Sequence, residues 1–216
     1  MISDLFSADN LRFLAGGLSV TLLISALSIF FSILIGTGLG VMRAGSNKAL
    51  SRIAGFYVET VRNIPNLLFI YAVRFLTPLP PIQAAVIAFT IFTSAAIAEI
   101  LRGGMNAIGR GQWEAAKSQG FGYLGTLRHV ILPQAFRVMI PPLMSQFVTV
   151  IKDTSFVWAI SIEELTGRGM ILMGKYSSFA QVLLLFGSIA ATYFVLNFTL
   201  STIARRYSAR LHAATH

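Results

Sequence analysis

Long apolar stretches alternate with short polar ones along the chain. A helix needs roughly 20 residues to cross about 30 Å of hydrocarbon. Five stretches meet or approach that length: residues 14–41, 54–76, 82–101, 137–162 and 180–203. The second is the least regular, because it includes Glu59, Arg62, Asn63, Pro65 and Arg74. This pattern predicts an all-α integral membrane protein with about five transmembrane helices, in which residues 1–216 form a single transmembrane domain.

The breaks between these stretches predict how the helices connect. The sequence PLPP at 78–81 is typical of a tight turn, and the glycine-rich residues 163–179 predict an outer loop or a partial helix. Gly36 and Gly40 stand at the GxxxG spacing, which lets two helices approach closely. We interpret these two glycines as packing residues.

Composition strengthens the membrane prediction. The chain is 55% hydrophobic and 12% charged, with a mean hydropathy of +0.72. A soluble domain of 216 residues could not hide that much apolar surface in its core. There is no cysteine, and the three histidines are scattered, so we expect neither disulfides nor a metal site. We expect no catalytic residues either, since no paired carboxylates, HExxH motif or nucleophile–base arrangement stands out.

Lysine and arginine are concentrated in particular connections. The formal charge of +9 is compatible with a nucleic-acid partner. In a membrane chain, basic residues that hold cytoplasmic ends in place explain it better, and we expect no nucleic acid. The more basic side carries Arg43, Lys48, Arg52, Arg102, Arg110, Lys117, Arg128, Arg137, Arg205, Arg206 and Arg210; the other carries Arg12, Arg168 and Lys175, with Arg74 near its edge. We therefore predict the N-terminus outside, the C-terminus inside, and a cytoplasmic segment at about 104–136.

The N-terminus does not have the pattern of a cleavable signal. Its first ten residues include Asp4 and Asp9 and no basic cluster. The apolar run from Phe13 to Val41 far exceeds the roughly 7–15 residues of a signal h-region. We expect this run to remain as the first span.

The cytoplasmic segment contains a polar stretch with helix-forming residues. Residues 113–119 predict a short helix, with Glu114 in its first turn and Ala115 and Ala116 as a low-profile face. Gly120, with Gly122 behind it, is suited to end the helix and turn the chain. A second stretch, 124–132, leads to Pro133, which suits the start of the next span. A small helix held off the membrane in this way predicts a docking site for another protein.

The same stretch contains an imperfect phosphate-loop pattern. GQWEAAKS at 111–118 resembles G-x-x-x-x-G-K-[ST], with Ala116 in place of the second glycine. A phosphate loop needs that glycine and follows a strand. Neither condition is met, so we expect no nucleotide to bind this chain.

The spacing in this segment resembles a family signature. Glu114-Ala115-Ala116, followed by Gly120, Val130, Leu132 and Pro133, resembles the EAA motif of ABC importer permeases; valine at 130 replaces the family's isoleucine. RNIP at 62–65, AEI at 98–100, RGG at 102–104, PQA at 133–135 and KDTS at 152–155 resemble polar amino-acid permeases. The resemblance covers nearly the whole chain, and it is strongest to the glutamine-type importers of Gram-positive bacteria.

This resemblance implies the ABC type I importer transmembrane-domain fold and a role as the permease subunit of an importer in a bacterial cell membrane. It implies that the EAA segment couples the spans to a separate ATPase, which binds ATP and Mg, so that no cofactor is expected on this chain. The implied partners are a second permease subunit, an ABC ATPase dimer, an extracellular solute-binding protein and a polar amino-acid substrate. An odd number of spans also argues against two equal halves in one chain. Whether the permease dimer is homo- or heteromeric stays open.

Polar residues inside spans are costly and mark a pathway by default. Lys152 and Asp153 interrupt the fourth stretch, with Thr154 and Ser155 beside them. A zwitterionic amino acid needs a cation for its carboxylate and an anion for its ammonium, and Lys152 and Asp153 supply both. A pathway or gate and a purely structural helix break are equally compatible with this pattern.

The second stretch contributes further candidates. Arg74 is a lone base near the outer end, where snorkelling to the interface is the default and attraction of a carboxylate the alternative. Asn63, Pro65 and Asn66 predict a kink that either lines a cavity or only bends a packing helix. Glu99 with Arg102, and Glu59 with Arg62, stand at the i,i+3 spacing of helical ion pairs.

The function expected from these patterns is an ABC importer permease for a polar L-amino acid, with glutamine first. The alternative is an ATP-independent secondary transporter or channel subunit. A membrane enzyme is disfavoured.

Overall fold

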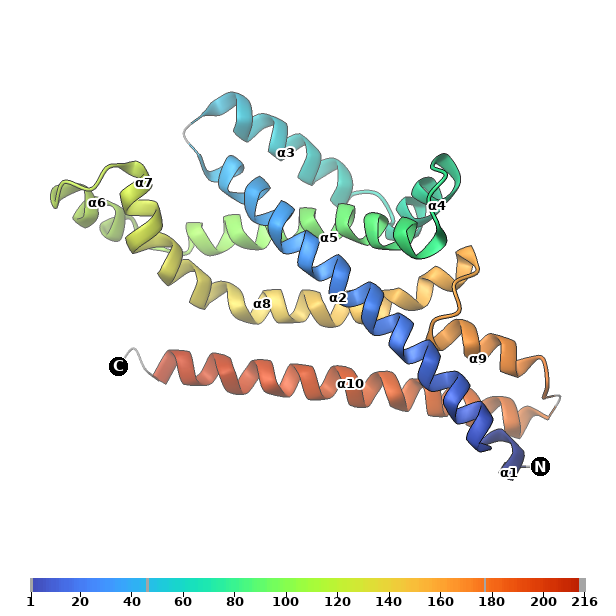
Figure 1. Ribbon diagram of the computed structural model, residues 1–216. Coiled ribbons are helices and arrows are strands. Elements are labelled where there is room, and N and C mark those ends of the chain that lie inside the picture. The colour runs from blue at the N-terminus through green and yellow to red at the C-terminus, as the bar shows by residue number, and fades with distance from the viewer. Residues whose placement is uncertain (1, 46, 177, 214–216) are drawn as a thin grey trace.

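The computed structural model describes residues 2–45, 47–176 and 178–213, and within these ranges the chain is helical with no strand. The elements in chain order are α1 (Ile2–Leu5), α2 (Ala8–Ala44), α3 (Lys48–Arg62), α4 (Asn66–Leu76), α5 (Pro81–Asn106), α6 (Arg110–Ser118), α7 (Tyr123–Thr126), the π-helix η1 (Leu127–Ile131), α8 (Leu132–Asp153), the 3₁₀-helix η2 (Thr154–Ile160), α9 (Leu165–Met173) and α10 (Phe179–Ala213). Helices α5, α8 and α10 lie side by side, and α2 crosses them obliquely (Figure 1).

Three of the described helices are long and apolar enough to cross a membrane: α2, α5, and α10 between Phe179 and Arg206. The other two predicted spans are helical but less regular. The α3–α4 region is divided into helices of 15 and 11 residues. Helix α8 has 22 residues and contains Pro141 and Pro142. The chain is therefore a multi-pass membrane protein whose second and fourth predicted spans depart from simple apolar helices.

The predicted kink in the second span is confirmed. Helix α3 ends at Arg62, and the backbone N–H of Asn63 donates to Thr60 O at 3.2 Å in a tightened last turn. Pro65 has no N–H and disfavours helical geometry in the residue before it, so the helix stops and α4 restarts at Asn66. The turn predicted at 78–81 is also present, between the end of α4 and Pro81 at the start of α5.

Helices α2 and α5 pack closely where the GxxxG spacing predicts it. A Cβ atom on Gly36 would lie 2.7 Å from the backbone oxygen of Ser94, and one on Gly40 would lie 2.5 Å from Leu101 Cδ2. Only glycine permits this approach. Ser32 Oγ adds a hydrogen bond across the contact to Thr90 O, at 3.4 Å.

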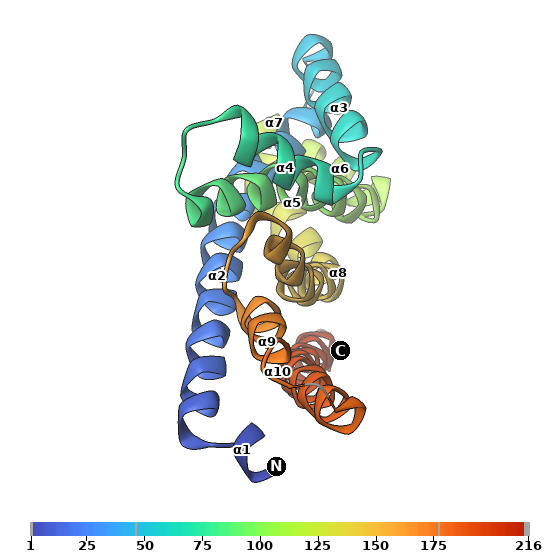
Figure 2. The ribbon, with the colours of Figure 1, turned by 90° about the vertical axis from the view of Figure 1, so that its right-hand side faces the viewer.

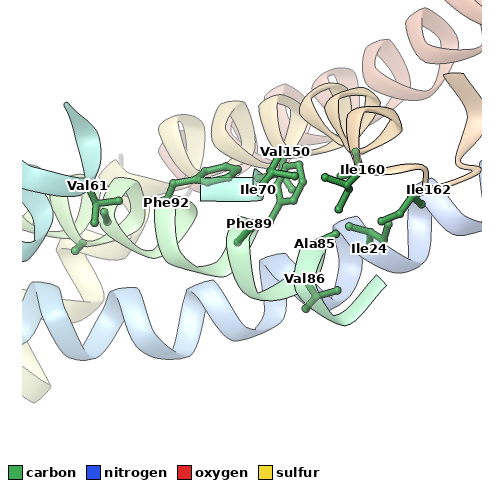
Figure 3. Close-up of a cluster of buried hydrophobic side chains, with 14 of the residues drawn as sticks. Ile24, Val61, Ile70, Ala85, Val86, Phe89, Phe92, Val150, Ile160 and Ile162 are labelled. Atoms are coloured by element: carbon green, nitrogen blue, oxygen red, sulfur yellow. The ribbon is translucent and has the colours of Figure 1, made fainter. Parts of the chain in front are cut away.

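The main hydrophobic core is formed where α2, α3, α4, α5, α8 and η2 meet (Figure 3). Phe89 and Phe92 of α5 pack with ring centroids 4.9 Å apart. Ile24 of α2, Ile70 of α4 and Val150 of α8 are fully buried against this cluster. The broken second span and the end of α8 are thus fixed to the long helices by apolar burial, which favours association at about 25 cal/mol per Å².

The predicted fourth span is interrupted. Helix α8 ends at Asp153 and continues as the 3₁₀-helix η2, which ends at Ser161 with a left-handed φ of 63°. The regular α-helix thus ends at Lys152 and Asp153, and this geometry is compatible with both a pathway or gate and a purely structural break. Residues 163–179, expected as an outer loop or partial helix, contain the nine-residue helix α9.

The two ends of the helix bundle differ in what they carry. Helices α6 and α7, the ends of α2 and α10 and the start of α3 lie at one end, whereas α1, α9 and the α4–α5 turn lie at the other (Figures 1 and 2). The basic connections predicted to share one side of the membrane are thus brought to one end. Which end faces the cytoplasm stays a prediction from the positive-inside rule.

Candidate functional site

The polar segment predicted to dock another protein forms a short helix, α6, followed by a sharp turn. Helix α6 begins at Arg110, three residues earlier than the pattern indicated. Glu114 therefore lies in the second turn, and the prediction that it complements the helix dipole in the first turn was wrong. The missing start signal explains the error, since α6 has no side-chain cap and Gly109 precedes it.

Gly120 ends α6 in the geometry predicted for it. Its φ is +84°, a left-handed conformation that glycine adopts without strain. The N–H of Gly120 donates to Lys117 O at 3.0 Å, and the N–H of Phe121 donates to Ala116 O at 3.1 Å. These two bonds are the Schellman pair that satisfies the last carbonyls of a helix. The exit direction of the chain is thus fixed at Gly120.

The two alanines of the EAA motif have different environments. Ala116 is 5% exposed and faces the chain's own interior, whereas Glu114 and Ala115 are exposed. The expectation that both alanines present a low-profile face to a partner is therefore wrong for Ala116. The side of α6 available to a partner carries Glu114 and Ala115.

Contacts hold this segment against the rest of the molecule. The rings of Trp113 and Tyr123 stack with centroids 6.0 Å apart, and Tyr123 Oη donates to Ala44 O at 3.0 Å, at the end of α2. Gln134 Nε2 of α8 donates to Gln112 Oε1 of α6 at 3.2 Å. A hollow of about 400 Å³ lies beside the Trp113–Tyr123 stack and is lined also by Glu114 and Lys117. A force on α6 would therefore reach both α2 and α8.

The remaining residues of the motif lie where this segment joins α8. Val130 and Leu132 are half-buried, and Pro133 is exposed at the start of α8, as predicted. The helix widens to a π-helix just before the proline, and the N–H of Leu132 donates to Leu127 O. A proline ring crowds the carbonyl four residues earlier, and the wider π-turn accommodates it while the helix stays continuous.

Asp153 is connected to the broken second span. Its Oδ2 accepts a hydrogen bond from Asn66 Nδ2 at 3.3 Å, which links the end of α8 to the start of α4. Asp153 is half-buried, whereas Lys152 is exposed. The predicted anion and cation are therefore adjacent in the chain but lie in different surroundings.

The other predicted pathway residues do not take part in the Asp153–Asn66 bond. Thr154 is fully buried, and its Oγ1 donates to Ile151 O at 2.6 Å, a local bond at the helix break. Asn63 is exposed, and its Nδ2 donates to Glu59 O at 2.7 Å. Ser155 is half-buried, and Arg74 is half-buried in the last turn of α4. The structure thus brings Asn66, rather than Asn63, to Asp153.

A cluster of ion pairs joins three helices at the end that carries α6. Glu99 of α5 accepts from Arg102 at 2.5 Å, which confirms the predicted i,i+3 pair, and from Arg43 of α2 at 2.6 Å. Arg62 of α3 lies 3.9 Å from Glu99, and Glu59 pairs with Arg43 at 3.3 Å. The predicted Glu59–Arg62 pair is therefore wrong, because each side chain finds a partner on another helix.

Sequence reasoning missed a buried carboxylate at the opposite end. Glu164 has no exposed surface and caps α9, accepting from the N–H groups of Thr166 and Gly167 at 2.9 and 2.7 Å. Tyr193 Oη of α10 and Thr21 Oγ1 of α2 also donate to it, at 2.8 and 3.2 Å. Four donors are enough to satisfy a buried carboxylate. The one local signal is a Glu just before an apolar helix. Among the described residues, no His, Cys, Asp or Glu group is arranged to hold a metal ion.

The sequence is similar to known transport proteins. Residues 32–213 match the family described as "Binding-protein-dependent transport system inner membrane component". The chain is 39% identical over 210 residues to the probable glutamine ABC transporter permease protein GlnP of Bacillus subtilis (strain 168), across 95% of this chain and 96% of that protein. It is 33% identical over 203 residues to the glutamine transport system permease protein GlnP of Escherichia coli (strain K12), across 90% and 91%.

Solved structures share the fold. The crystal structure described as an amino acid ABC transporter with histidines superposes with a TM-score of 0.84 at 30% identity, covering 94% of this chain and 95% of that one. An inward-facing structure of the MetNI methionine ABC transporter gives a TM-score of 0.78 at 21% identity, covering 93% and 99%. These neighbours are transmembrane subunits of ABC type I importers, so the predicted fold is confirmed.

Proposed function

Because the chain belongs to the family of inner membrane components of binding-protein-dependent transport systems, we propose that it is the permease subunit of an ATP-driven importer of a polar L-amino acid. Glutamine is the first candidate. The importer lies in a bacterial cell membrane, with α6 on the cytoplasmic side. The chain supplies part of the translocation path and no catalytic residue; ATP and Mg bind to a separate ATPase.

The observation that carries the proposal is the construction of α6. Its exposed side offers Glu114 and Ala115, its end is fixed by the left-handed Gly120, and its base is held by Trp113. A rigid, projecting helix of this kind fits a pocket on an ATPase subunit, and it can transmit a movement of that subunit to the rest of the chain without bending. Gln112 receives the hydrogen bond from Gln134 of α8, and α8 leads directly to Asp153.

The working assembly needs more than one chain. Three long apolar helices and two irregular ones leave Asp153 and Arg74 only half-buried, and a second permease subunit, either a copy of this chain or a related one, would complete the path. Two ATPase subunits receive the α6 helices, and an extracellular solute-binding protein delivers the amino acid.

Asp153 is the residue we assign to the substrate ammonium. Its half-buried carboxylate lies where α8 ends, and Asn66 fixes its orientation. Lys152 and Arg74, two cations at the same end of the molecule, attract the substrate carboxylate as it enters. Thr154 and Ser155 follow Asp153 at the start of η2, whereas Asn63 ends α3 on the other side of the break before Asn66.

The substrate assignment is tested by uptake in a deletion strain. The similarity to glutamine permeases extends over nine-tenths or more of the chain. Removal of the gene is therefore expected to abolish high-affinity uptake of L-glutamine. Uptake is measured with labelled glutamine, glutamate and histidine, and restored by the wild-type gene on a plasmid. Normal uptake of all three amino acids, with another solute lost, would contradict the assignment.

A further inference from the structure

One side of α10 changes from apolar to polar near the predicted end of its span. Phe198, Ser201, Arg205 and Ser208 follow the spacing i, i+3, i+7, i+10, which places them on one face of the helix. Phe198 is 54% exposed and lies within the apolar stretch that ends at residue 203, whereas Arg205 and Ser208 lie beyond it. The polar half of this face therefore lies at the membrane surface, at the end of the bundle that carries α6 (Figure 1).

A hollow of about 480 Å³, the α8–α10 hollow, lies beside this face and between the two helices. Ser201, Arg205 and Ser208 line it from α10, and Ser145 and Val148 are among the α8 residues that line it. Back-bonding to its own helix is the usual way in which a helical serine is satisfied. The hydroxyls of these three serines have no hydrogen bond to any described residue, so they are available to a ligand.

Arg205 is exposed, and its guanidinium is turned back toward the membrane-spanning part of α10. Nη2 donates to Thr202 Oγ1 at 3.0 Å, and the guanidinium carbon lies 5.9 Å from the centre of the Phe198 ring. An arginine that only snorkels to water would extend the other way, toward the C-terminal end of the helix. Within the described part of the chain, no carboxylate lies within ion-pair distance of Arg205. The guanidinium is therefore held where the apolar stretch ends, without an anion from these residues.

An anion for Arg205 has to come from outside the described chain, and the depth of the guanidinium favours a lipid phosphate. Lipid phosphates lie in the headgroup layer, just outside the roughly 30 Å of hydrocarbon, and the guanidinium lies where the apolar stretch of α10 ends. A guanidinium binds two phosphate oxygens side by side, and serine hydroxyls can donate to the others. A free phosphate ion would satisfy the same groups but would leave the exposed ring of Phe198 uncovered.

The α8–α10 hollow also favours a headgroup without a cation. A choline or ethanolamine headgroup adds a positive charge, and the described part of the chain offers no carboxylate beside Arg205 to pair with it. An anionic headgroup such as that of phosphatidylglycerol brings no such charge, and basic side chains at a membrane surface attract anionic lipids.

We propose that this face of α10 and the α8–α10 hollow bind an anionic phospholipid in the leaflet at the α6 end. The lipid phosphate accepts from the Arg205 guanidinium and from the hydroxyls of Ser201 and Ser208. One acyl chain lies along Phe198 and Val148, on the side of the hollow nearer the membrane centre. The lipid thus contacts both α8 and α10, and its binding does not depend on which amino acid the chain transports.

The test uses the full-length chain, purified with the subunits of its complex in a neutral detergent and freed of bound lipid. The complex is titrated with phosphatidylglycerol, and the lipid bound at each concentration is counted by mass spectrometry of the intact complex. Phosphatidylcholine with the same acyl chains tests the headgroup, and inorganic phosphate tests a free anion as a competitor. Arg205→Gln removes the charge, and Ser201→Ala with Ser208→Ala removes two hydroxyls. Arg206→Gln is the matched control, because Arg206 is exposed and does not line the hollow.

Wild type is expected to bind phosphatidylglycerol about fivefold more tightly than phosphatidylcholine, the effect of one basic side chain on an anionic lipid. Arg205→Gln should weaken phosphatidylglycerol binding about tenfold, because hydrogen bonds to a charged group are lost. The double serine variant should show a smaller loss, and Arg206→Gln should stay within about threefold of wild type. The yield of the complex should be the same for all variants.

Equal affinity for the two lipids, or the same affinity in Arg205→Gln as in wild type, would overturn the inference and leave the proposed function intact. An equal loss in Arg206→Gln would indicate only a general effect of surface charge and would overturn it too. Displacement of the lipid by inorganic phosphate would assign the site to a free anion instead. A lower yield of the Arg205→Gln complex before lipid is added would assign Arg205 to a carboxylate of a neighbouring subunit.

Discussion

At the scale of single residues, Asp153 combines a structural bond with an available charge. Its carboxylate accepts from Asn66 Nδ2 at 3.3 Å and is only half-buried. One oxygen thus fixes the junction of α8 and α4, while the charge itself has no ion pair among the described residues. A carboxylate kept in a membrane without a paired cation is costly, and a cost of this kind is typical of a functional residue.

Asp153→Asn separates these two roles. Asparagine has nearly the same shape and still offers an oxygen to Asn66, so the complex should assemble at wild-type yield. The loss of charge should lower uptake about tenfold or more, the typical value of a charged hydrogen bond. Asn66→Ala removes the bond and keeps the charge. Failure of the Asp153→Asn complex to assemble, with Asn66→Ala equally affected, would instead identify Asp153 as a structural residue.

Single residues also show what sequence can and cannot predict. The left-handed φ of Gly120 was predictable, because a glycine after a helix-forming run is the usual end of a helix. The burial of Ala116 was not predictable, because the sequence pattern does not show which side of α6 faces the rest of the molecule. Glu164 was missed because its four partners are visible only after folding. Thr21 and Tyr193 come from helices far away in the chain, and the two capping bonds, from the N–H groups of Thr166 and Gly167, depend on where α9 begins.

At the scale of elements, hydrophobic length predicted that the long helices α2, α5 and α10 exist, and it placed the starts of α5 and α10 to within one residue. The helices extend beyond the apolar stretches at their other ends, because polar residues continue the helix outside the hydrocarbon: α2 is Ala8–Ala44, α5 ends at Asn106 and α10 at Ala213. Hydrophobic length did not predict the helix boundaries at positions where the backbone geometry interrupts an apolar stretch. Pro65 divides the second span, and the change to 3₁₀ geometry after Asp153 shortens α8. The π-helix before Pro133 has no recognisable sequence signal other than the proline itself.

The α2–α5 contact gives a matched pair of glycine variants. Gly36→Leu would force a side chain into the Ser94 carbonyl and Ile97, whereas a Cβ atom on Gly38 has no neighbour within 4 Å. Both changes gain the same helix propensity. Gly36→Leu should therefore lower stability by at least about 1–3 kcal/mol relative to Gly38→Leu. Thermal unfolding in detergent measures this difference, and equal unfolding temperatures would contradict the close packing of α2 on α5.

At the scale of the whole molecule, interactions at each end tie α2 to other helices. At one end, Arg43 binds Glu99 and Ala44 accepts from Tyr123 of the α6–α7 segment. At the other, Thr21 donates to Glu164, and Arg168 Nη1 of α9 donates to Phe13 O at 2.6 Å. Helix α2 has 37 residues, about 55 Å of rigid length. A displacement of α6 can therefore reach α9 as well as the nearby end of the bundle.

The proposed coupling is tested most directly by asking whether α6 binds an ATPase subunit. The permease is purified with a tag from cells that also express the ATPase, and ATP hydrolysis is measured with and without loaded binding protein. Ala115→Trp enlarges the exposed side of α6, and Gly120→Val opposes the φ of +84°. Ala116→Trp is not suitable, because Ala116 is 5% exposed and a tryptophan would disrupt the chain's own packing. Phe194→Trp, on an exposed position of α10, controls for the added tryptophan.

Wild type and Phe194→Trp should retain the ATPase and respond to loaded binding protein with a several-fold rise in hydrolysis. Ala115→Trp and Gly120→Val should insert into the membrane at normal levels, yet lose the ATPase or hold it without stimulation. Wild-type retention and stimulation in both of these variants would mean that α6 is an ordinary loop helix and that the chain is not coupled to an ATPase through it.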